Sequence, residues 1–191
     1  MFYVLVHFPG IDNTDINRIR RRYDPTFRII DPHITLMFPV PAGMGEEKLV
    51  RHLISVLGKW KSFPIHLKGF VKSWDHWLFM TLDQGKTEIE QLYHDIYTGI
   101  LTEFKRPDIP FIPHLGLGLF VTKGANYELL DPKAVEFDQN RYETALEEAK
   151  KLNLDYRCVF NKVHLLKLNE NLTRIMDRKT FKLEDRGSTI L

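Results

Sequence analysis

The chain has 191 residues, with 27 basic and 25 acidic side chains and a formal net charge of +2 at pH 7, which excludes a surface built for general polyanion binding. Its composition of 43% hydrophobic and 27% charged residues excludes a disordered or fibrous chain. A single cysteine, Cys158, excludes an intrachain disulfide, and no apolar run approaches the ~20 residues of a membrane-spanning helix, so we expect a cytoplasmic protein without membrane contacts.

The hydrophobic pattern alternates between strand-like and helix-like segments along the chain. Those expected as strands are, in order, Phe2–Phe8, His33–Val40, Phe63–Trp74, Trp77–Leu82, His114–Val121, Asp155–Leu168 and Leu172–Leu183. Those expected as helices are a segment capped by Asp12 or Thr14 that runs to Tyr23, and then Glu46–Trp60, Lys86–Phe104 and Arg141–Leu152. The stretch Gly124–Asn140 is expected to be irregular. Several strands are joined by short turns without a strict βαβ alternation, which predicts an α+β fold with mainly antiparallel sheet.

One short element occurs twice in the chain. Pro32-His33-Ile34-Thr35-Leu36 opens one predicted strand and Pro113-His114-Leu115-Gly116-Leu117 opens another, with the histidines 114 − 33 = 81 residues apart. Two related segments in the two halves of a chain indicate internal duplication. We therefore expect two pseudo-symmetric lobes of sheet flanked by helices, with a cleft between them. Residues 1–183 would form this single two-lobed domain, and residues 184–191 a flexible tail.

The repeat is informative because side chains alternate between the two faces of a strand. His33 and Thr35 share one face of the first strand, and His114, Gly116 and Gly118 share one face of the second. The opposite face of each strand is apolar and suited to a core. Two such strands placed side by side would line a cleft with two imidazoles.

The two motifs resemble the signature of the 2H phosphoesterase superfamily, which includes the 2′-5′ RNA ligase and cyclic phosphodiesterase proteins. That signature is a pair of His-apolar-Thr/Ser-apolar motifs about this far apart, and the resemblance covers most of the chain, from the first strand to the closing hairpin. The first motif, His33-Ile34-Thr35-Leu36, fits fully. The second, His114-Leu115-Gly116-Leu117, has glycine where a hydroxyl residue is usual.

The resemblance implies a metal-independent phosphodiesterase acting on 2′,3′-cyclic phosphates or 2′-5′-linked RNA or nucleotide ends, with RNA ligation as the reverse reaction. His33 and His114 would be the catalytic acid and base, roles that suit imidazole because its unperturbed pKa is ~6.5. Thr35 would bind the phosphate, and the backbone at Gly116, a water or a side chain elsewhere would complete the binding. No cofactor or metal is implied. The expected partner is an RNA end or a cyclic nucleotide, without DNA sequence recognition, and the sequence indicates no oligomeric state.

Two other hypotheses compete with this one. Gly116 favours a non-catalytic module that keeps the two-histidine cleft to bind a nucleotide or an RNA end. A metal-dependent hydrolase that uses the histidines as ligands has little support, because no carboxylate accompanies either histidine at a helpful spacing.

Other conspicuous residues have an ordinary structural interpretation. The basic run of Arg18, Arg20, Arg21 and Arg22 is typical of the solvated face of a helix, with contact to an RNA phosphate, together with Arg28, as the alternative. The aromatic residues Trp74, Trp77, Phe79 and Phe120 are expected in the core, and stacking on a nucleobase is the alternative for one of them near the cleft.

Overall fold

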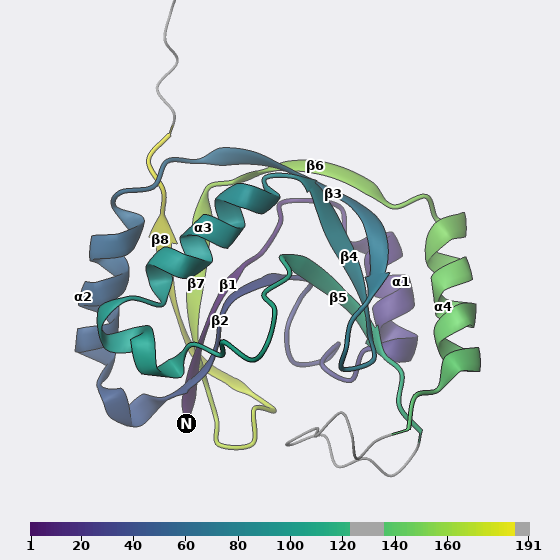
Figure 1. The fold of residues 1–191 in the computed structure, drawn as a ribbon, viewed down its shortest axis with the longest axis horizontal. Coiled ribbons are helices and arrows are strands. Elements are labelled where there is room, and N and C mark those ends of the chain that lie inside the picture. Colours follow the sequence, from purple (N-terminus) through teal and green to yellow (C-terminus); the bar gives the residue numbers. More distant parts are fainter. Residues whose placement is uncertain (123–135, 186–191) are drawn as a thin grey trace, which may run out of the picture.

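The structure is a computed structural model in which residues 1–122 and 136–185 are described. In this part of the chain, eight strands form one antiparallel sheet that curls on itself, with helices packed along it (Figure 1). The strands are β1 (Phe2–His7), β2 (Ile34–Pro41), β3 (Phe63–Lys72), β4 (Trp77–Gln84), β5 (His114–Leu119), β6 (Asp155–Phe160), β7 (Lys162–Leu168) and β8 (Ile175–Lys182). The helices are α1 (Thr14–Tyr23), α2 (Glu46–Leu57), α3 (Lys86–Ile96) and α4 (Gln139–Lys151), with the 3-10 helices η1 (Ala42–Met44) and η2 (Gly99–Phe104).

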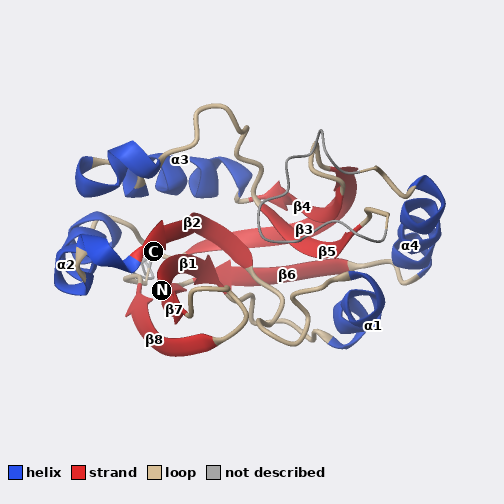
Figure 2. Cartoon of the chain, turned by 90° about the horizontal axis from the view of Figure 1, so that it is seen from below, coloured by secondary structure: helices blue, strands red, loops and turns tan. Residues whose placement is uncertain are grey.

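The order of the strands divides the sheet into two related halves, the first lobe with β2, β1, β7 and β8 and the second lobe with β6, β3, β4 and β5. The order is β6-β3-β4-β5-β2-β1-β7-β8, so the two strands that carry the repeated motif, β5 and β2, lie next to each other at the centre. Helices α2 and α3 lie at one end of the sheet and α1 and α4 at the other (Figure 2). The expected α+β fold with two pseudo-symmetric lobes of antiparallel sheet is thereby confirmed.

The apolar face of the two central strands fixes them in the main core. Ile34 and Leu36 of β2 and Leu115 and Leu117 of β5 have no exposed surface. Burying an aliphatic side chain of this size contributes roughly 1.5–3 kcal/mol. The two motifs are therefore anchored by the same residues that alternate with their polar positions, and the backbone at both histidines is held by the core.

The segment Asp155–Leu168 is not the single strand that its sequence suggests. It is interrupted at Asn161 and contributes β6, which pairs with β3 at one edge, and β7, which pairs with β1 in the other half. β6 is the edge strand of its half and exposes alternate residues, whereas β7 has neighbours on both sides and is mostly buried. A strand-like pattern thus continues across the point at which the chain passes from one half of the sheet to the other.

The expected helix Lys86–Phe104 also ends early. Helix α3 stops at Ile96, and the 3-10 helix η2 follows from Gly99. The Thr98 hydroxyl donates to the Asp95 carbonyl at 2.7 Å, a local bond that replaces the helical pattern, and Gly99 has a positive φ of 54°. As a result Ile100, which continues the apolar period in the sequence, is 39% exposed.

Gly118 does not share the face of Gly116. In the β4–β5 ladder, Leu78 pairs with Gly118 and Phe79 with Gly116, so one extra residue of β5 forms a bulge and shifts the alternation. A Cβ atom at Gly118 would lie 2.5 Å from the Cβ of Tyr23, at the end of α1. Only glycine lets the helix end approach the strand this closely, so Gly118 serves packing and not the cleft.

Helix α4 begins at Gln139, two residues earlier than expected, because the Asp138 side chain caps it by accepting from the Arg141 N–H at 3.0 Å. Most of the stretch expected to be irregular, and residues 186–191 of the expected tail, lie outside the described residues. The division into a domain and a tail stays a prediction. No helix in the described part of the chain is long and apolar enough to span a membrane.

Candidate active site

The two histidines of the repeated motif meet where the halves of the sheet join. His114 is the first residue of β5 and His33 directly precedes β2. The two strands are antiparallel and pair at Ile34 and Leu115, so the flanking positions face each other, His33 opposite Gly116 and Thr35 opposite His114. Opposed residues have Cβ atoms ~4.5–5.5 Å apart and diagonal ones ~7–8 Å. The imidazoles are diagonal neighbours, a spacing that suits a group bound between them.

Both rings are anchored in the same way. The Nδ1–H of His33 donates to the carbonyl of Asp31 at 2.8 Å, and the Nδ1–H of His114 donates to the carbonyl of Ile112 at 2.5 Å. Each acceptor lies two residues before its histidine, and a carbonyl can only accept, so the hydrogen of each neutral ring is on Nδ1. Nε2 is then left with a lone pair on both rings, which is the form required of a general base.

Burial keeps both rings neutral at pH 7. Desolvation in the cleft lowers the pKa of His33 to about 4 and that of His114 to about 4, although the backbone hydrogen bonds act in the opposite direction. The charge of His33 lowers the pKa of His114 further, because the two rings are near enough for their charged forms to repel each other. A bound anion would reverse this balance and favour a proton on one of them.

A cleft of about 1100 Å³ contains all four residues that the motifs indicated. His33, Thr35, His114 and Gly116 line it together with residues from the end of α1, the β3–β4 hairpin and the loop before β5. The structure therefore brings the four residues to one place, in a space large enough for a nucleotide-sized ligand.

Aromatic residues of the β3–β4 hairpin form the wall beside His114. The ring of Phe79 stacks on the imidazole, with centroids 3.4 Å apart and planes at 16°. Trp74, which is 47% exposed, and Trp77 line the same cleft. The expectation of a core position is wrong for Trp74 and Trp77, which are exposed and half-buried at the cleft, and it is confirmed for Phe79 and Phe120, which are 8% and 0% exposed.

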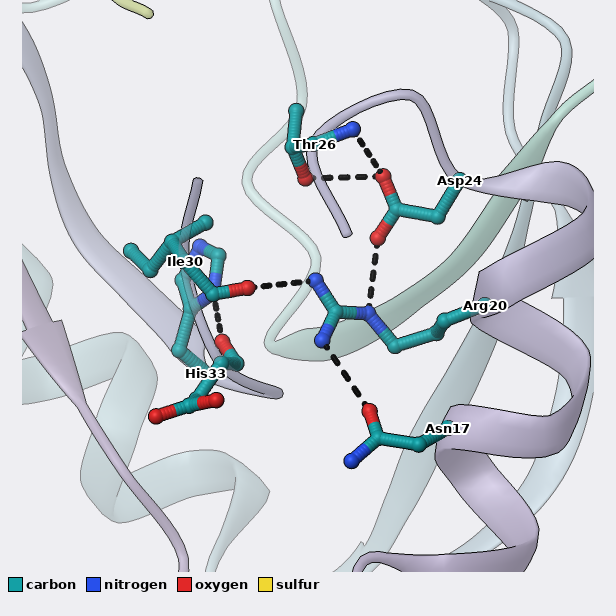
Figure 3. Close-up of polar contacts among 7 residues, drawn as sticks. Asn17, Arg20, Asp24, Thr26, Ile30 and His33 are labelled. Atoms are coloured by element: carbon teal, nitrogen blue, oxygen red, sulfur yellow. Dashed lines mark hydrogen bonds and ion pairs between the residues drawn. The ribbon is translucent and has the colours of Figure 1, made fainter. Parts of the chain in front are cut away.

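Arg20 departs from the sequence expectation for its basic run. Arg18, Arg21 and Arg22 are exposed, but Arg20 is 1% exposed and lines the cleft. Its Nε donates to Asp24 at 2.7 Å, one Nη to the Ile30 carbonyl at 2.8 Å, and the other to the Asn17 side chain at 3.4 Å (Figure 3). The signal that sequence reasoning missed is Asp24, four residues on, an ion-pair spacing on a helix.

This network supports the segment that leads into His33. Asp24 also accepts from the backbone N–H and the hydroxyl of Thr26, both at 2.7 Å. Arg20 thus joins the end of α1 to Ile30, one residue before the carbonyl that holds the His33 ring. A buried guanidinium with these partners is satisfied and rigid, so it acts as a brace for the first histidine.

The described residues contain no group of three or more His, Cys, Asp and Glu side chains arranged to hold a metal ion. Two histidines outside the two motifs have hydrogen-bond partners of their own. His66 bridges Asp83 and Asp155 at 3.0 and 2.6 Å, and His52 bonds the Ile96 carbonyl at 2.9 Å.

Comparisons with known proteins place these features in context. A family model described as the 2′-5′ RNA ligase superfamily matches residues 8–172. A protein of Bacillus licheniformis classed by name as a phosphoesterase is 31% identical over 119 residues, covering 60% of this chain and 69% of that protein. One of Geobacillus thermodenitrificans, named likewise, is 27% identical over 122 residues, covering 62% and 69%.

Solved structures share the fold over nearly the whole chain. The crystal structure of E. coli LigT in its apo form has a TM-score of 0.53 at 15% identity and covers 96% of this chain and 98% of LigT. LigT complexed with 3′-AMP has a TM-score of 0.52 at 16% identity and covers 95% and 96%. At 15% and 16% sequence identity, these two similarities establish the fold of the chain.

Proposed function

The chain belongs to the 2′-5′ RNA ligase superfamily and is a phosphoesterase, and we propose that it is a metal-independent phosphodiesterase acting on 2′,3′-cyclic phosphates or 2′-5′ linkages at RNA or nucleotide ends. The observation that carries the proposal is the pair His33 and His114, which sit diagonally across one strand pair with Nδ1 anchored and Nε2 unprotonated. The LigT complex with 3′-AMP supports a nucleotide as the ligand class, since that protein has the same fold.

In the proposed hydrolysis, the oxygen of a water molecule attacks phosphorus, and the bond from phosphorus to one ribose oxygen breaks. The neutral imidazole of one histidine accepts a proton from the water at Nε2. The imidazolium of the other donates its Nε2 proton to the leaving ribose oxygen, so that protons and charge balance. General acid–base help of this kind contributes typically 10²–10⁴-fold to the rate. Both proton transfers are made by the histidines, and no step calls for a metal.

Thr35 supplies the phosphate contact on the side of the first lobe. Thr35 lines the cleft at the strand position opposite His114. There its hydroxyl donates to a non-bridging oxygen of the substrate phosphate. Negative charge on that oxygen increases in the transition state, so the bond strengthens as the reaction proceeds. At Gly116 the second lobe offers only its backbone, which makes phosphate binding unequal between the two halves.

Gly116 also supports a second candidate, a module that binds a nucleotide or RNA end without reacting. Loss of one phosphate donor weakens transition-state stabilisation more than ground-state binding. Such a module would keep the cleft and the two imidazoles but lack turnover. Calorimetric titration of 3′-AMP, run beside a turnover assay, distinguishes the two, because binding without turnover selects the module.

The test of the proposed function is turnover of a nucleoside 2′,3′-cyclic phosphate and of a 2′-5′-linked dinucleotide in excess EDTA, with products separated by chromatography. We expect turnover that EDTA leaves unchanged. The double variant His33→Ala/His114→Ala serves as the blank, since it keeps the fold but lacks both proton-transfer groups. Turnover that disappears in EDTA and returns with a divalent cation contradicts a metal-independent reaction.

The pH dependence of kcat/KM is expected to peak near pH 4, below the ~6.5 of an ordinary histidine. The reactive form carries one proton on the pair, one ring as base and the other as acid. Because the pKa of each ring is about 4, the fraction of this form rises as the pH falls from 8 and declines once both rings are protonated. A cyclic phosphodiester does not titrate in this range, so the profile reports the free protein.

Between pH 7 and pH 5, kcat/KM should rise roughly tenfold per pH unit. The folded state must be checked by circular dichroism at each pH. A histidine whose pKa is lowered on folding contributes stability that is present above ~6.5 and is lost as the pH falls toward the folded value. A maximum near pH 6.5 contradicts the low pKa of the two rings.

A further inference from the structure

The indole of Trp77 lies directly beside Gly116 of the second motif. A Cβ atom built on Gly116 would lie 3.4 Å from Cζ3 and 3.5 Å from Cε3 of the indole, which is direct van der Waals contact. The surface beside that Cβ position is therefore aromatic carbon. Gly116 and Trp77 thus lie against each other, and the side of the cleft that lacks the hydroxyl presents an aromatic ring.

The corresponding place in the first lobe is different. There the residue at the cleft surface is Thr35, which carries a hydroxyl. Its partner on β1 is Val6, a fully buried residue of a small apolar cluster. In the second lobe Gly116 pairs with Phe79, and Trp77 lies two residues earlier on the same face of β4. One wall of the cleft is therefore suited to a phosphate and the other to a flat apolar ring.

Core packing alone does not account for Trp77. Of the described residues, the main core and the apolar residues packed against it include Trp60 but neither Trp77 nor Phe79. Trp77 is only partly buried and lines the cleft, as does the exposed Trp74 three residues earlier in the chain. Large aromatic side chains partly open to a concave site are typical of ligand contacts.

We propose that Trp77, with the room made by Gly116, forms a nucleobase-binding subsite on the His114 side of the cleft. The inference rests on the proposed function and makes it more specific: the substrate is a nucleoside phosphate whose base stacks on the indole. Its phosphate lies between His33 and His114 and takes its side-chain hydroxyl contact from Thr35. Stacking does not read hydrogen-bond edges, so the subsite accepts any base and discriminates against a phosphate that carries none.

The test compares a nucleoside 2′,3′-cyclic phosphate with the base-free ribose 2′,3′-cyclic phosphate. The measured quantity is the ratio of their kcat/KM values. Trp77→Leu keeps an apolar side chain but removes the π-face, and we expect it to lower this ratio by roughly 5- to 150-fold, the range for loss of one base stack. Trp77→Phe restores most of the ratio. Trp60→Phe, at a tryptophan outside the cleft, keeps the wild-type ratio.

A ratio that Trp77→Leu leaves unchanged overturns the subsite, whether both activities fall together or neither does. Calorimetric binding of 3′-AMP and of ribose 3-phosphate by the wild type and Trp77→Leu separates this outcome from failure of the proposed function. If the wild type turns over neither cyclic substrate, the binding data still test the subsite. Preference for 3′-AMP that depends on Trp77 supports it, and equal affinity of the wild type for both ligands overturns it.

Discussion

His33→Ala and His114→Ala are each expected to lower kcat on a nucleoside 2′,3′-cyclic phosphate by roughly 10²–10⁴-fold while the protein remains folded. Each substitution removes one of the two proton-transfer groups. Each ring is hydrogen-bonded to one backbone carbonyl at the edge of the cleft, and that of His114 also stacks on Phe79, so either substitution leaves the core residues of both strands in place. Steady-state kinetics measure the effect, and the urea midpoint verifies that the fold is retained.

The two effects should not add. Groups that act as a unit lose most of their benefit when either is removed, so the double variant should be little slower than the slower single variant. His94→Ala is the matched control, because His94 lies outside the cleft, beside Lys105, and should keep the wild-type kcat. Full activity in either His33→Ala or His114→Ala would refute a site built on the pair.

The sequence predicted the centre of this site because the information there is local. The period of two residues in each motif decides which side chains share a face with the histidine, and the apolar partners decide which face is buried. Ile34, Leu36, Leu115 and Leu117 are all fully buried as that pattern requires. The matching element in the other half then predicted a pseudo-symmetric pair, and β2 and β5 are indeed neighbours.

The walls of the cleft could not be predicted in the same way, because they depend on contacts between distant segments. In the sequence, Trp77 and Phe79 look like ordinary strand residues. Only the pairing of β4 with β5 places Trp77 beside Gly116 and Phe79 beside His114. The break at Asn161 could not be predicted for the same reason. Only the pairing of β6 with β3 and of β7 with β1 shows that the chain passes from one lobe to the other there. The hydrophobic period of a strand indicates which of its faces is buried, but it does not indicate which other strand pairs with it.

The burial of Arg20 was not predicted from the sequence for a different reason. A run of arginines on a helix is most often solvated, and three of the four follow that rule. Arg20 is buried because one face of α1 also carries the core residues Ile16 and Ile19, and the Asp24 carboxylate at the helix end neutralises it. Charge composition alone gives no sign of this; the pairing of Arg20 with Asp24 four residues on was the available signal.

Arg20→Met is expected to destabilise the protein by about 3–5 kcal/mol, the usual cost of removing one partner of a buried ion pair. The side chains of Arg20 and Asp24 are 1% and 3% exposed, so the carboxylate would be left charged, buried and without its counter-ion. The Ile30 carbonyl would lose its donor as well. Urea unfolding followed by circular dichroism measures the change, and an effect below about 1 kcal/mol, as for a surface pair, contradicts it.

Adding Asp24→Asn to Arg20→Met separates the effect of Arg20 on stability from its effect on the position of His33. The variant Arg20→Met/Asp24→Asn has no buried charge, and the amide oxygen can still accept from Thr26, so most of the lost stability should return. The bond from Arg20 to Ile30 remains absent, however, and with it the brace before His33. We therefore expect kcat to stay low in the double variant with KM little changed, and Arg20→Lys to recover part of it through a single donor. If kcat returns together with stability, Arg20 contributes to the fold alone, and the position of His33 is determined by the strand that follows it.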